Sequence, residues 1–280
     1  MSRSPVSGEP TIDIVIPCHE KDAWILPRAI SGARRNVLHR IGSVVVVAPE
    51  SRKIQSVCRR LDCEFVLEDV AAPLPRRDVN CNVNGRDCSG WIYQQLIKLS
   101  ADRVSKADYI LVVDADTVLI RPHVFRKCEQ TVLFVTPEGR GNYCAAYARL
   151  LALEWLHSDS FITHYMLLER QKLAELRDAI EAVVKQPWYS AILATADAAT
   201  DASFFSEYET YGNFCLVNYV DEFLLERADN LALPPSWIAM LPLIVLAGRW
   251  RSVSLHHYAE SEDRRIVLRR VLRSFVNREP

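Results

Sequence analysis

The chain has 280 residues, of which 49% are hydrophobic and 25% charged, and its formal net charge at pH 7 is -1. This length can bury a sizeable core in one large α/β domain or two small ones. A nearly neutral chain has no overall attraction for nucleic acid, so we expect no nucleic-acid partner and only local binding of charged ligands.

Compartment signals in the sequence favour the cytoplasm. The first ten residues are polar and include Pro and Gly, so no secretory signal is expected. The longest nearly apolar run, Trp237–Gly248, contains Pro242 and is too short to span a bilayer. The eight cysteines form no paired CxxC spacing, and we expect reduced thiols, with a Cys81–Cys88 disulfide as the alternative.

Strands and helices alternate at the start of the chain. Apolar runs predict strands at Thr11–Pro17, Ser43–Ala48 and Glu64–Leu67, and helical spacing predicts helices at Trp24–Leu38 and Lys53–Leu61. This order is typical of crossovers that build a parallel sheet. Such sheets bind ligands at the carboxyl ends of their strands, so one rim is expected to hold Pro17–Asp22, Pro49–Arg52, Glu68–Asp69 and Asp114–Thr117.

A long polar loop, Ala71–Gly90, follows the third strand and carries Arg76, Arg77 and Arg86. Long loops in compact domains are usually functional or disordered. The next segment, Gly90–Arg103, is predicted to be a helix whose apolar residues face the sheet. Gln94, Gln95 and Lys98 occupy its other sides, where Lys98 would either reach a phosphate or be an ordinary exposed lysine.

The run Tyr109–Leu119 combines a buried strand with two carboxylates. Five apolar residues, Tyr109–Val113, predict a strand buried on both faces. Strand alternation would point Asp114 and Asp116 the same way, roughly 6 to 7 Å apart. Paired carboxylates suit Mg²⁺ or Mn²⁺ with phosphate oxygens as further ligands. The alternative is a solvated turn begun by Asp116 or Thr117.

The second half is predicted to be more helical. We expect a strand at Thr131–Pro137, a helix at Tyr143–Trp155 and a long amphipathic helix at Tyr165–Lys185. No low-complexity linker separates the halves, so we expect one continuous domain made of two parts, 11–137 and 138–280.

Two later stretches are rich in reactive side chains. Ser203–Phe214 places Glu207 and Glu209 among hydroxyls and aromatic rings, a mixture that suits a polyhydroxylated ligand such as a sugar; the alternative is an edge helix with an aromatic core side. Val253–Tyr258 ends in His256 and His257. One of these would be a third metal ligand, the alternative being ordinary core or surface histidines.

The tail Arg264–Arg278 holds six arginines and no acidic residue, which predicts a basic amphipathic helix. Such a helix would either contact an anionic membrane at its inner face or cover a flank of the domain, and the second reading is favoured.

Three segments, TIDIVIPC, Asp114-Ala115-Asp116 and LHHY, resemble glycosyltransferases of the GT-A fold. The segments GWIYQQLIKL, DADT and SEYETYGNF look like a bacterial subgroup of these proteins. The resemblance spans roughly residues 11 to 258. It implies an α/β, Rossmann-like fold with a mostly parallel central sheet flanked by helices, in which 11–137 binds a nucleotide sugar and the more helical second part binds the acceptor.

The resemblance also implies a reaction and roles for residues. A sugar would pass from a nucleoside-diphosphate donor to a hydroxyl of a saccharide, lipid-linked or small-molecule acceptor, in bacterial glycan or glycoconjugate biosynthesis. Asp114, Asp116 and His257, chosen over His256, would hold Mn²⁺ or Mg²⁺ against the diphosphate. Glu207 or Glu209 would be the base or nucleophile, with retention favoured. Donor contacts would come from Pro17, His19, Glu20, Arg86, Gln94, Lys98, Asp114 and Ala115.

Two other readings remain. VVDADTVL also resembles the first motif of haloacid-dehalogenase-type phosphatases, in which Asp114 would be the nucleophile and Asp116 the acid/base. That motif usually opens its domain, whereas three predicted strands precede it here, and no later GDxxxD follows. A non-catalytic nucleotide-sugar-binding protein is the third reading. The carboxylate pair, the histidine pair and the polar loop favour turnover.

Overall fold

The computed structural model describes residues 10–137, 143–199, 203–237, 243–256, 266–268 and 271. Within them the central sheet has five strands in the order β10-β6-β1-β2-β3. Four are parallel, and β10 at one edge is antiparallel, which confirms the predicted α/β class with a mostly parallel sheet. The strands are β1 (Ile12–Pro17), β2 (Ile41–Ala48), β3 (Glu64–Leu67), β6 (Tyr109–Val113) and β10 (Tyr165–Glu169).

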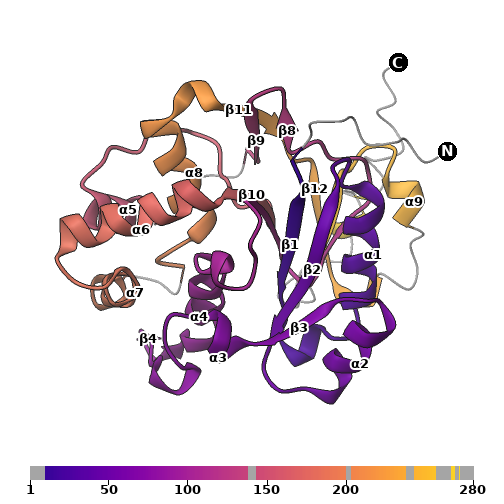
Figure 1. Ribbon diagram of the computed structural model, residues 1–280, viewed down its shortest axis with the longest axis horizontal. Coiled ribbons are helices and arrows are strands. Elements are labelled where there is room, and N and C mark those ends of the chain that lie inside the picture. Colours follow the sequence, from indigo (N-terminus) through magenta and orange to yellow (C-terminus); the bar gives the residue numbers. More distant parts are fainter. Residues whose placement is uncertain are drawn as a thin grey trace.

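Helices cover both faces of this sheet (Figure 1). In β1, Ile14 and Ile16 join the core beneath α1 and α2, whereas Val15 joins the core that contains α4 and the second-half helices. Successive strand side chains point to opposite faces, so the sheet is buried on both sides. These helices are α1 (Leu26–Asn36), α2 (Arg52–Arg60), α4 (Ser89–Lys98), α5 (Tyr143–Leu151), α6 (Arg170–Val184), α7 (Trp188–Leu193) and α8 (Glu207–Asn218).

Small sheets connect the late part of the chain to the central sheet. β13 pairs with β7 directly after the aspartates, so Ser254 lies opposite Thr117 and their hydroxyl oxygens are 2.8 Å apart. This pairing brings His256, which directly follows β13, near the predicted aspartate pair. The remaining elements are α3 (Glu68–Ala71), β4 (Asn82–Val83), β5 (Arg86–Asp87), β7 (Thr117–Leu119), β8 (Arg126–Lys127), β9 (Gln130–Val135), β11 (Phe223–Arg227), β12 (Asn230–Leu233), α9 (Leu243–Leu246) and β13 (Ser252–Leu255).

The predicted helix Tyr165–Lys185 is wrong in its first five residues. Tyr165–Glu169 forms β10 instead, paired residue by residue with β6, and helix α6 begins at Arg170. Tyr165, Met166, Leu167 and Leu168 are all buried. Because four consecutive buried residues need cover on both sides, the sheet edge suits this run better than an amphipathic helix, which buries one stripe.

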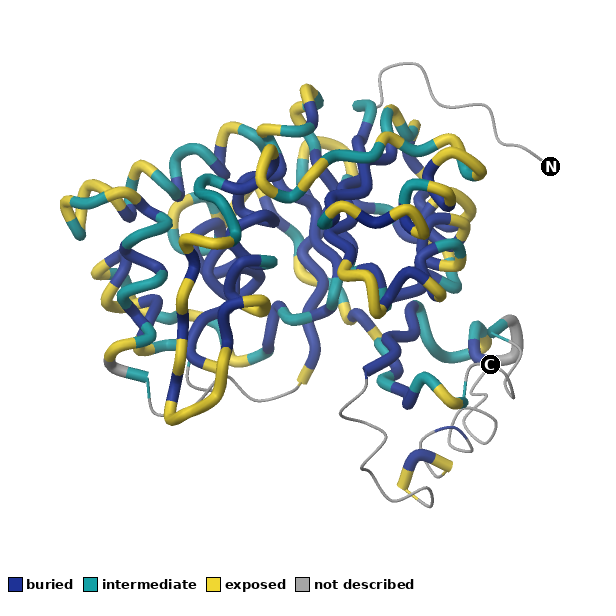
Figure 2. The backbone as a smooth tube through the Cα atoms, turned by 90° about the horizontal axis from the view of Figure 1, so that it is seen from below, coloured by how far each residue is buried: buried dark blue, intermediate teal, exposed yellow. Residues whose placement is uncertain are grey.

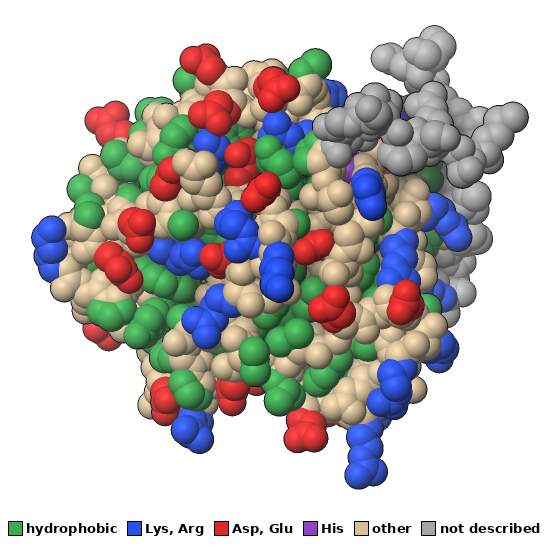
Figure 3. Space-filling view, in the orientation of Figure 1, with side chains coloured by type: hydrophobic (Ala, Val, Ile, Leu, Met, Phe, Trp, Pro, Cys, Tyr) green, Lys and Arg blue, Asp and Glu red, His purple; other side chains and the backbone are tan. Residues whose placement is uncertain are grey.

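Burial is concentrated in the strands and the helix faces that contact them, with exposed residues around the periphery (Figure 2). On the face seen in Figure 3, acidic and basic side chains alternate without a field of one sign, as the near-neutral net charge leads one to expect. Within the described part of the chain, no helix has the length and apolar character needed to cross a membrane. No disulfide links the eight cysteines, all of which lie in that part.

The tail predicted to be a basic helix lies mostly outside the described residues. Only 266–268 and 271 of it are described, and Val267 and Val271 are buried in a core cluster with Leu231 and Leu255. The predicted membrane contact of this tail stays a prediction.

Candidate active site

The carboxyl ends of the central strands open onto a cavity of about 820 Å³. One wall, here called the N-terminal wall, comes from β1, β2, β3, β6 and α4 and includes Pro17, Pro49, Glu68 and Asp114. The C-terminal wall comes from the second half and consists of Tyr143, Ile162, His164, Ser203, Ser206, Glu207, Tyr208 and His256. The predicted rim of strand ends is therefore confirmed as one side of a cavity.

The two aspartates lie in a turn between β6 and β7. The backbone N–H of Thr117 donates to the Asp114 carbonyl at 2.9 Å, and the Asp114 N–H donates to the His164 carbonyl at 2.9 Å. The observed turn therefore begins at Asp114 and not, as in the alternative reading, at Asp116 or Thr117, and its two carboxylates are largely shielded from solvent. The Asp114 side chain is 15% exposed and the Asp116 side chain 23%, and both line the cavity.

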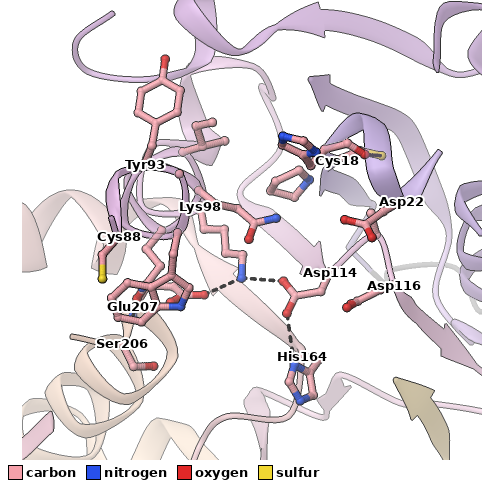
Figure 4. A pocket seen from close by; sticks show the side chains of 18 of the residues that line it. Cys18, Asp22, Cys88, Tyr93, Lys98, Asp114, Asp116, His164, Ser206 and Glu207 are labelled. Carbon is pink, nitrogen blue, oxygen red and sulfur yellow. Dashed lines mark hydrogen bonds and ion pairs between the residues drawn. The ribbon is translucent and has the colours of Figure 1, made fainter. Parts of the chain in front are cut away.

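Lys98 joins the two walls (Figure 4). Its ammonium lies 2.5 Å from Asp114 Oδ1 and 2.7 Å from Glu207 Oε1, and 4.5 Å from the centre of the Tyr208 ring. Burial alone would lower the pKa of Lys98, but the two carboxylates outweigh it and hold that pKa above its usual value. Lys98 is therefore a fixed positive charge between two acids and not an exposed helix lysine.

Each aspartate also pairs with a histidine from the C-terminal wall. His164 Nδ1 lies 3.2 Å from Asp114 Oδ2, and His256 Nδ1 lies 3.2 Å from Asp116 Oδ2. The Tyr208 hydroxyl donates to Asp114 Oδ1 at 3.1 Å. Burial would raise the pKa of Asp114, but Lys98 and His164 overcome that effect and hold the pKa well below its usual value. The two imidazole rings are adjacent, with centres 4.6 Å apart.

The structure brings most of the predicted site residues together. Glu20 is not among the cavity-lining residues, and its carboxylate is 3.6 Å from Lys53 at the surface. His257 lies outside the described residues, whereas its neighbour His256, the other histidine considered, reaches the cavity. The predicted residues that line the cavity are Pro17, His19, Arg86, Gln94, Lys98, Asp114, Ala115, Asp116 and Glu207.

Glu207 and Glu209 have different surroundings although they are close in sequence. Glu207 lines the cavity, whereas Glu209 is fully buried and accepts a hydrogen bond from Ser160 Oγ at 2.5 Å. Helix positions i and i+2 do not share a face, so α8 separates the two carboxylates. Burial raises the pKa of Glu209 to about 7. The structure thus brings Glu207, and not Glu209, to the other candidate residues.

The donor set of the cavity suits a divalent cation that a ligand helps to hold. Six carboxylates line the cavity against four Lys or Arg side chains, a formal charge of -2 with neutral histidines. Among the described residues, no three His, Cys, Asp or Glu side chains converge as metal ligands. Mg²⁺ usually binds through one or two carboxylates, waters and substrate phosphates, so Asp116 with His256, and Asp114 beside them, fit such an ion.

Several residues of the site were missed in the sequence. His164 precedes β10 and has a φ of 67°, but the segment after it was predicted to be a helix and so drew no attention to a strand-end histidine. The pattern that could have identified His164 is the one that identified His256, namely a histidine next to a short apolar run. Trp91 also lines the cavity and is missed because a single aromatic residue carries no spacing signal, whereas Ser206 and Tyr208 belong to the segment Ser203–Phe214 that is expected to bind a sugar.

Residues 33–232 match the model of DUF6492, described as a family of unknown function. The chain belongs to DUF6492. The matched range of DUF6492 includes Lys98, Asp114, Asp116, His164 and Glu207. A search of curated proteins finds no match.

Among solved structures, this DUF6492 chain is similar to mouse xyloside xylosyltransferase 1 in its apo form. The two share 10% sequence identity with a TM-score of 0.49, and the match covers 89% of this chain and 99% of that chain.

Proposed function

We propose that the protein is a metal-dependent glycosyltransferase that moves a sugar from a nucleoside-diphosphate donor to a hydroxyl acceptor. The observation that carries the proposal is a set of three polar side-chain pairs that join the two walls of the cavity. Lys98 pairs with Glu207, Asp114 with His164 and Asp116 with His256, all in one cavity at the carboxyl edge of a parallel sheet. That edge is where open α/β sheets bind nucleotides.

The charge of the cavity supports a role for a cation. A diphosphate would be repelled by a surplus of carboxylates, and a bound Mn²⁺ or Mg²⁺ would supply the positive charge that stabilises the leaving diphosphate. Asp116 and His256 would hold the ion, with Asp114 beside them. His257, outside the described residues, stays a predicted ligand. Arg86 and Gln94 would contact the donor, and Pro17 and His19 its nucleoside.

Glu207 is proposed as the carboxylate at the reacting carbon. Lys98 and the amide of Gln95 fix its position, because Lys98 bonds its side chain and Gln95 Oε1 accepts its backbone N–H at 3.1 Å. In the favoured retaining course, Glu207 would attack the anomeric carbon as the bond to the diphosphate breaks. The acceptor hydroxyl would then displace the Glu207 carboxylate and give its proton to the released diphosphate. In an inverting course it would take the proton of the acceptor hydroxyl.

A thermal-shift series tests the proposal. The melting temperature would be measured with UDP-glucose and GDP-mannose, each with and without Mn²⁺, because a ligand of the native state raises its stability. We expect at least one donor to raise it only when Mn²⁺ is present. Release of UDP or GDP with acceptor would show transfer, and the anomeric configuration of the product would separate retention from inversion. Release of phosphate from monoesters with no effect of nucleotide sugars would instead favour the phosphatase reading.

Replacement of Asp116 is the sharpest variant. Asp116→Asn keeps the size of the side chain but removes its charge, so transfer should fall at least about 100-fold while the fold is retained. Asp178→Asn, the same change at an exposed position of α6 away from the cavity, is the matched control and should leave transfer unchanged. Full activity of Asp116→Asn would contradict the assignment of the site.

A further inference from the structure

A tryptophan on the first turn of α4 has no role in the proposed chemistry. Trp91 lines the cavity and is 37% exposed, although the neighbouring ring of Phe204 is buried. The two ring centres are 5.4 Å apart with planes at 71°, an edge-to-face contact that orients the indole. A large aromatic side chain that is held in place and yet left partly exposed in a cavity is typical of a binding surface.

The position of Trp91 relates it to the reacting carboxylate. Trp91, Gln95 and Lys98 lie at i, i+4 and i+7 and so share one side of α4, and all three line the cavity. The backbone positions of Trp91 and Lys98 are about 10 Å apart along the helix axis, and the Lys98 ammonium holds Glu207 at 2.7 Å. The indole and the Glu207 carboxylate therefore line the same cavity of about 820 Å³.

The amide of Gln95, which lies between Trp91 and Lys98 along α4, is chemically suited to bind a ligand. Gln95 is 3% exposed, and its Oε1 accepts from the Glu207 backbone, which fixes its Nε2 as a donor. In the described part of the chain, Nε2 has no hydrogen-bond acceptor. A buried donor without a partner is costly, so a ligand oxygen that satisfied it would be bound favourably.

The surroundings of Trp91 place it on the acceptor side. Its ring partner Phe204 belongs to the segment that leads through Ser206 into α8, which carries Glu207. The residues proposed for the nucleoside, Pro17 and His19, come instead from the end of β1. An aromatic face also suits a nucleobase, and the experiment below separates the two.

We propose that Trp91 and Gln95 form a subsite for a saccharide acceptor, in which a sugar ring packs on the indole and presents a hydroxyl to Glu207. This rests on the proposed function and narrows its acceptor to a carbohydrate, in place of a simple alcohol or a lipid-linked group without a sugar at its reacting end. Sugars present apolar C–H faces together with hydroxyls, which match an aromatic ring beside an amide and a carboxylate.

Saturation-transfer NMR with methyl glycosides tests the subsite directly. The probes are the methyl β-glycosides of glucose, galactose, xylose and mannose, with cyclohexanol as a ring-shaped alcohol that lacks the further hydroxyls. We expect at least one glycoside, and not cyclohexanol, to bind through its ring protons. Trp91→Ala should weaken that binding about tenfold, and Trp91→Phe, which keeps an aromatic face, should restore most of it.

Trp24→Ala is the matched control. Trp24 is 45% exposed and is not among the cavity-lining residues, so its loss should leave glycoside binding unchanged. Circular dichroism and the melting temperature of each variant report whether the fold is intact. In Trp91→Ala, the rise in melting temperature caused by nucleotide sugar and Mn²⁺ should persist.

The outcomes separate this subsite from the proposed function. If nucleotide sugars bind but no glycoside does, or if Trp91→Ala binds glycosides like the unaltered chain, the subsite is overturned and the transferase proposal stands. If Trp91→Ala instead loses the nucleotide-induced shift, Trp91 is a nucleobase platform and the subsite is again overturned. If glycosides bind through Trp91 but no nucleotide sugar binds, a sugar-binding site at Trp91 is supported, whereas its acceptor role and the transferase proposal both fail.

Discussion

The two walls of the cavity are built in different ways. The N-terminal wall consists mainly of strand ends and one face of α4, so most of its side chains are set by regular hydrogen-bonded backbone, and the loop before α4 adds Arg76, Arg86 and Asp87. The C-terminal wall takes single residues from separate places, with His164 before β10, Glu207 at the start of α8 and His256 after β13. The first wall is a continuous scaffold, whereas the second depends on its contacts with the first.

The C-terminal wall does not come from one continuous element of secondary structure, and ion pairs with the N-terminal wall hold its side chains in place. Lys98 lies between Asp114 of its own wall and Glu207 of the other, and each side chain of this trio is at most 15% exposed. Charges with so little water around them must be paired to be tolerated. The comparison therefore predicts that the C-terminal wall is sensitive to charge changes on the N-terminal wall.

The largest expected effect is that of Lys98→Met. The substitution keeps the side-chain length but leaves Asp114 and Glu207 close together and partly buried without their cation, so we expect a loss of about 3 to 5 kcal/mol in the free energy of unfolding. Urea unfolding at pH 8 measures it. The deficit should shrink toward pH 4, where protonation relieves the two carboxylates.

Lys172→Met is the matched control for this prediction. Lys172 is also a buried helix lysine, 2.8 Å from Glu222, but the side chain of Glu222 is 54% exposed. Water can therefore solvate the carboxylate that remains, and the loss should be much smaller, about 1 kcal/mol. Equal losses for the two lysines would mean that the cavity charges need no pairing across the walls.

The same difference between the walls explains what could be predicted from the sequence. Apolar runs and helical spacing are local signals, so β1, α1, β2, α2 and β3 were located closely, and Asp114 and Asp116 were found at a strand end. Lys98 and Glu207 were identified separately, but their pairing is not, because they are 109 positions apart and no local pattern links them. The sequence does not point to His164, because the apolar run of β10 fits a strand or a helix by periodicity alone and is predicted to be a helix.

The second largest effect is a pH dependence of stability that comes from Glu209 and not from Glu207. Glu209 has a pKa raised by burial to about 7 from an ordinary value of 4.5, so it binds a proton more tightly in the native than in the unfolded state. Stability should therefore fall as pH rises from about 4.5 to 7, by up to about 3 kcal/mol, and then stay level. Glu209→Gln stays neutral and keeps the acceptor for Ser160, so it should be more stable than the unaltered chain at pH 8 and equal to it at pH 4.

Glu207→Gln provides the opposite case. Its carboxylate is paired with Lys98, so neutralisation removes a favourable contact and should not stabilise the protein at pH 8. If Glu209→Gln raises the stability at pH 8 and Glu207→Gln lowers it, the carboxyl group in the cavity is charged and the one in the core is neutral. A stabilising Glu207→Gln, or a Glu209→Gln that loses transfer as fully as Asp116→Asn, would reverse the roles assigned to them.

The smallest effect concerns the start of α8. Ser206 is its N-cap, with an extended φ of -143° and a hydroxyl that accepts from the Glu209 N–H at 3.3 Å. Ser206→Ala leaves that N–H without its partner and should cost about 1 kcal/mol, whereas Ser206→Thr keeps the acceptor and should cost less. The cost is limited because nine residues of α8, Glu207 to Cys215, are buried and hold the helix by packing. Hydrogen exchange at the Glu209 amide should speed up in Ser206→Ala and not in Ser206→Thr. If Ser206→Ala lost as much stability as Lys98→Met, the helix cap, and not the ion pair with Lys98, would hold the C-terminal wall in place.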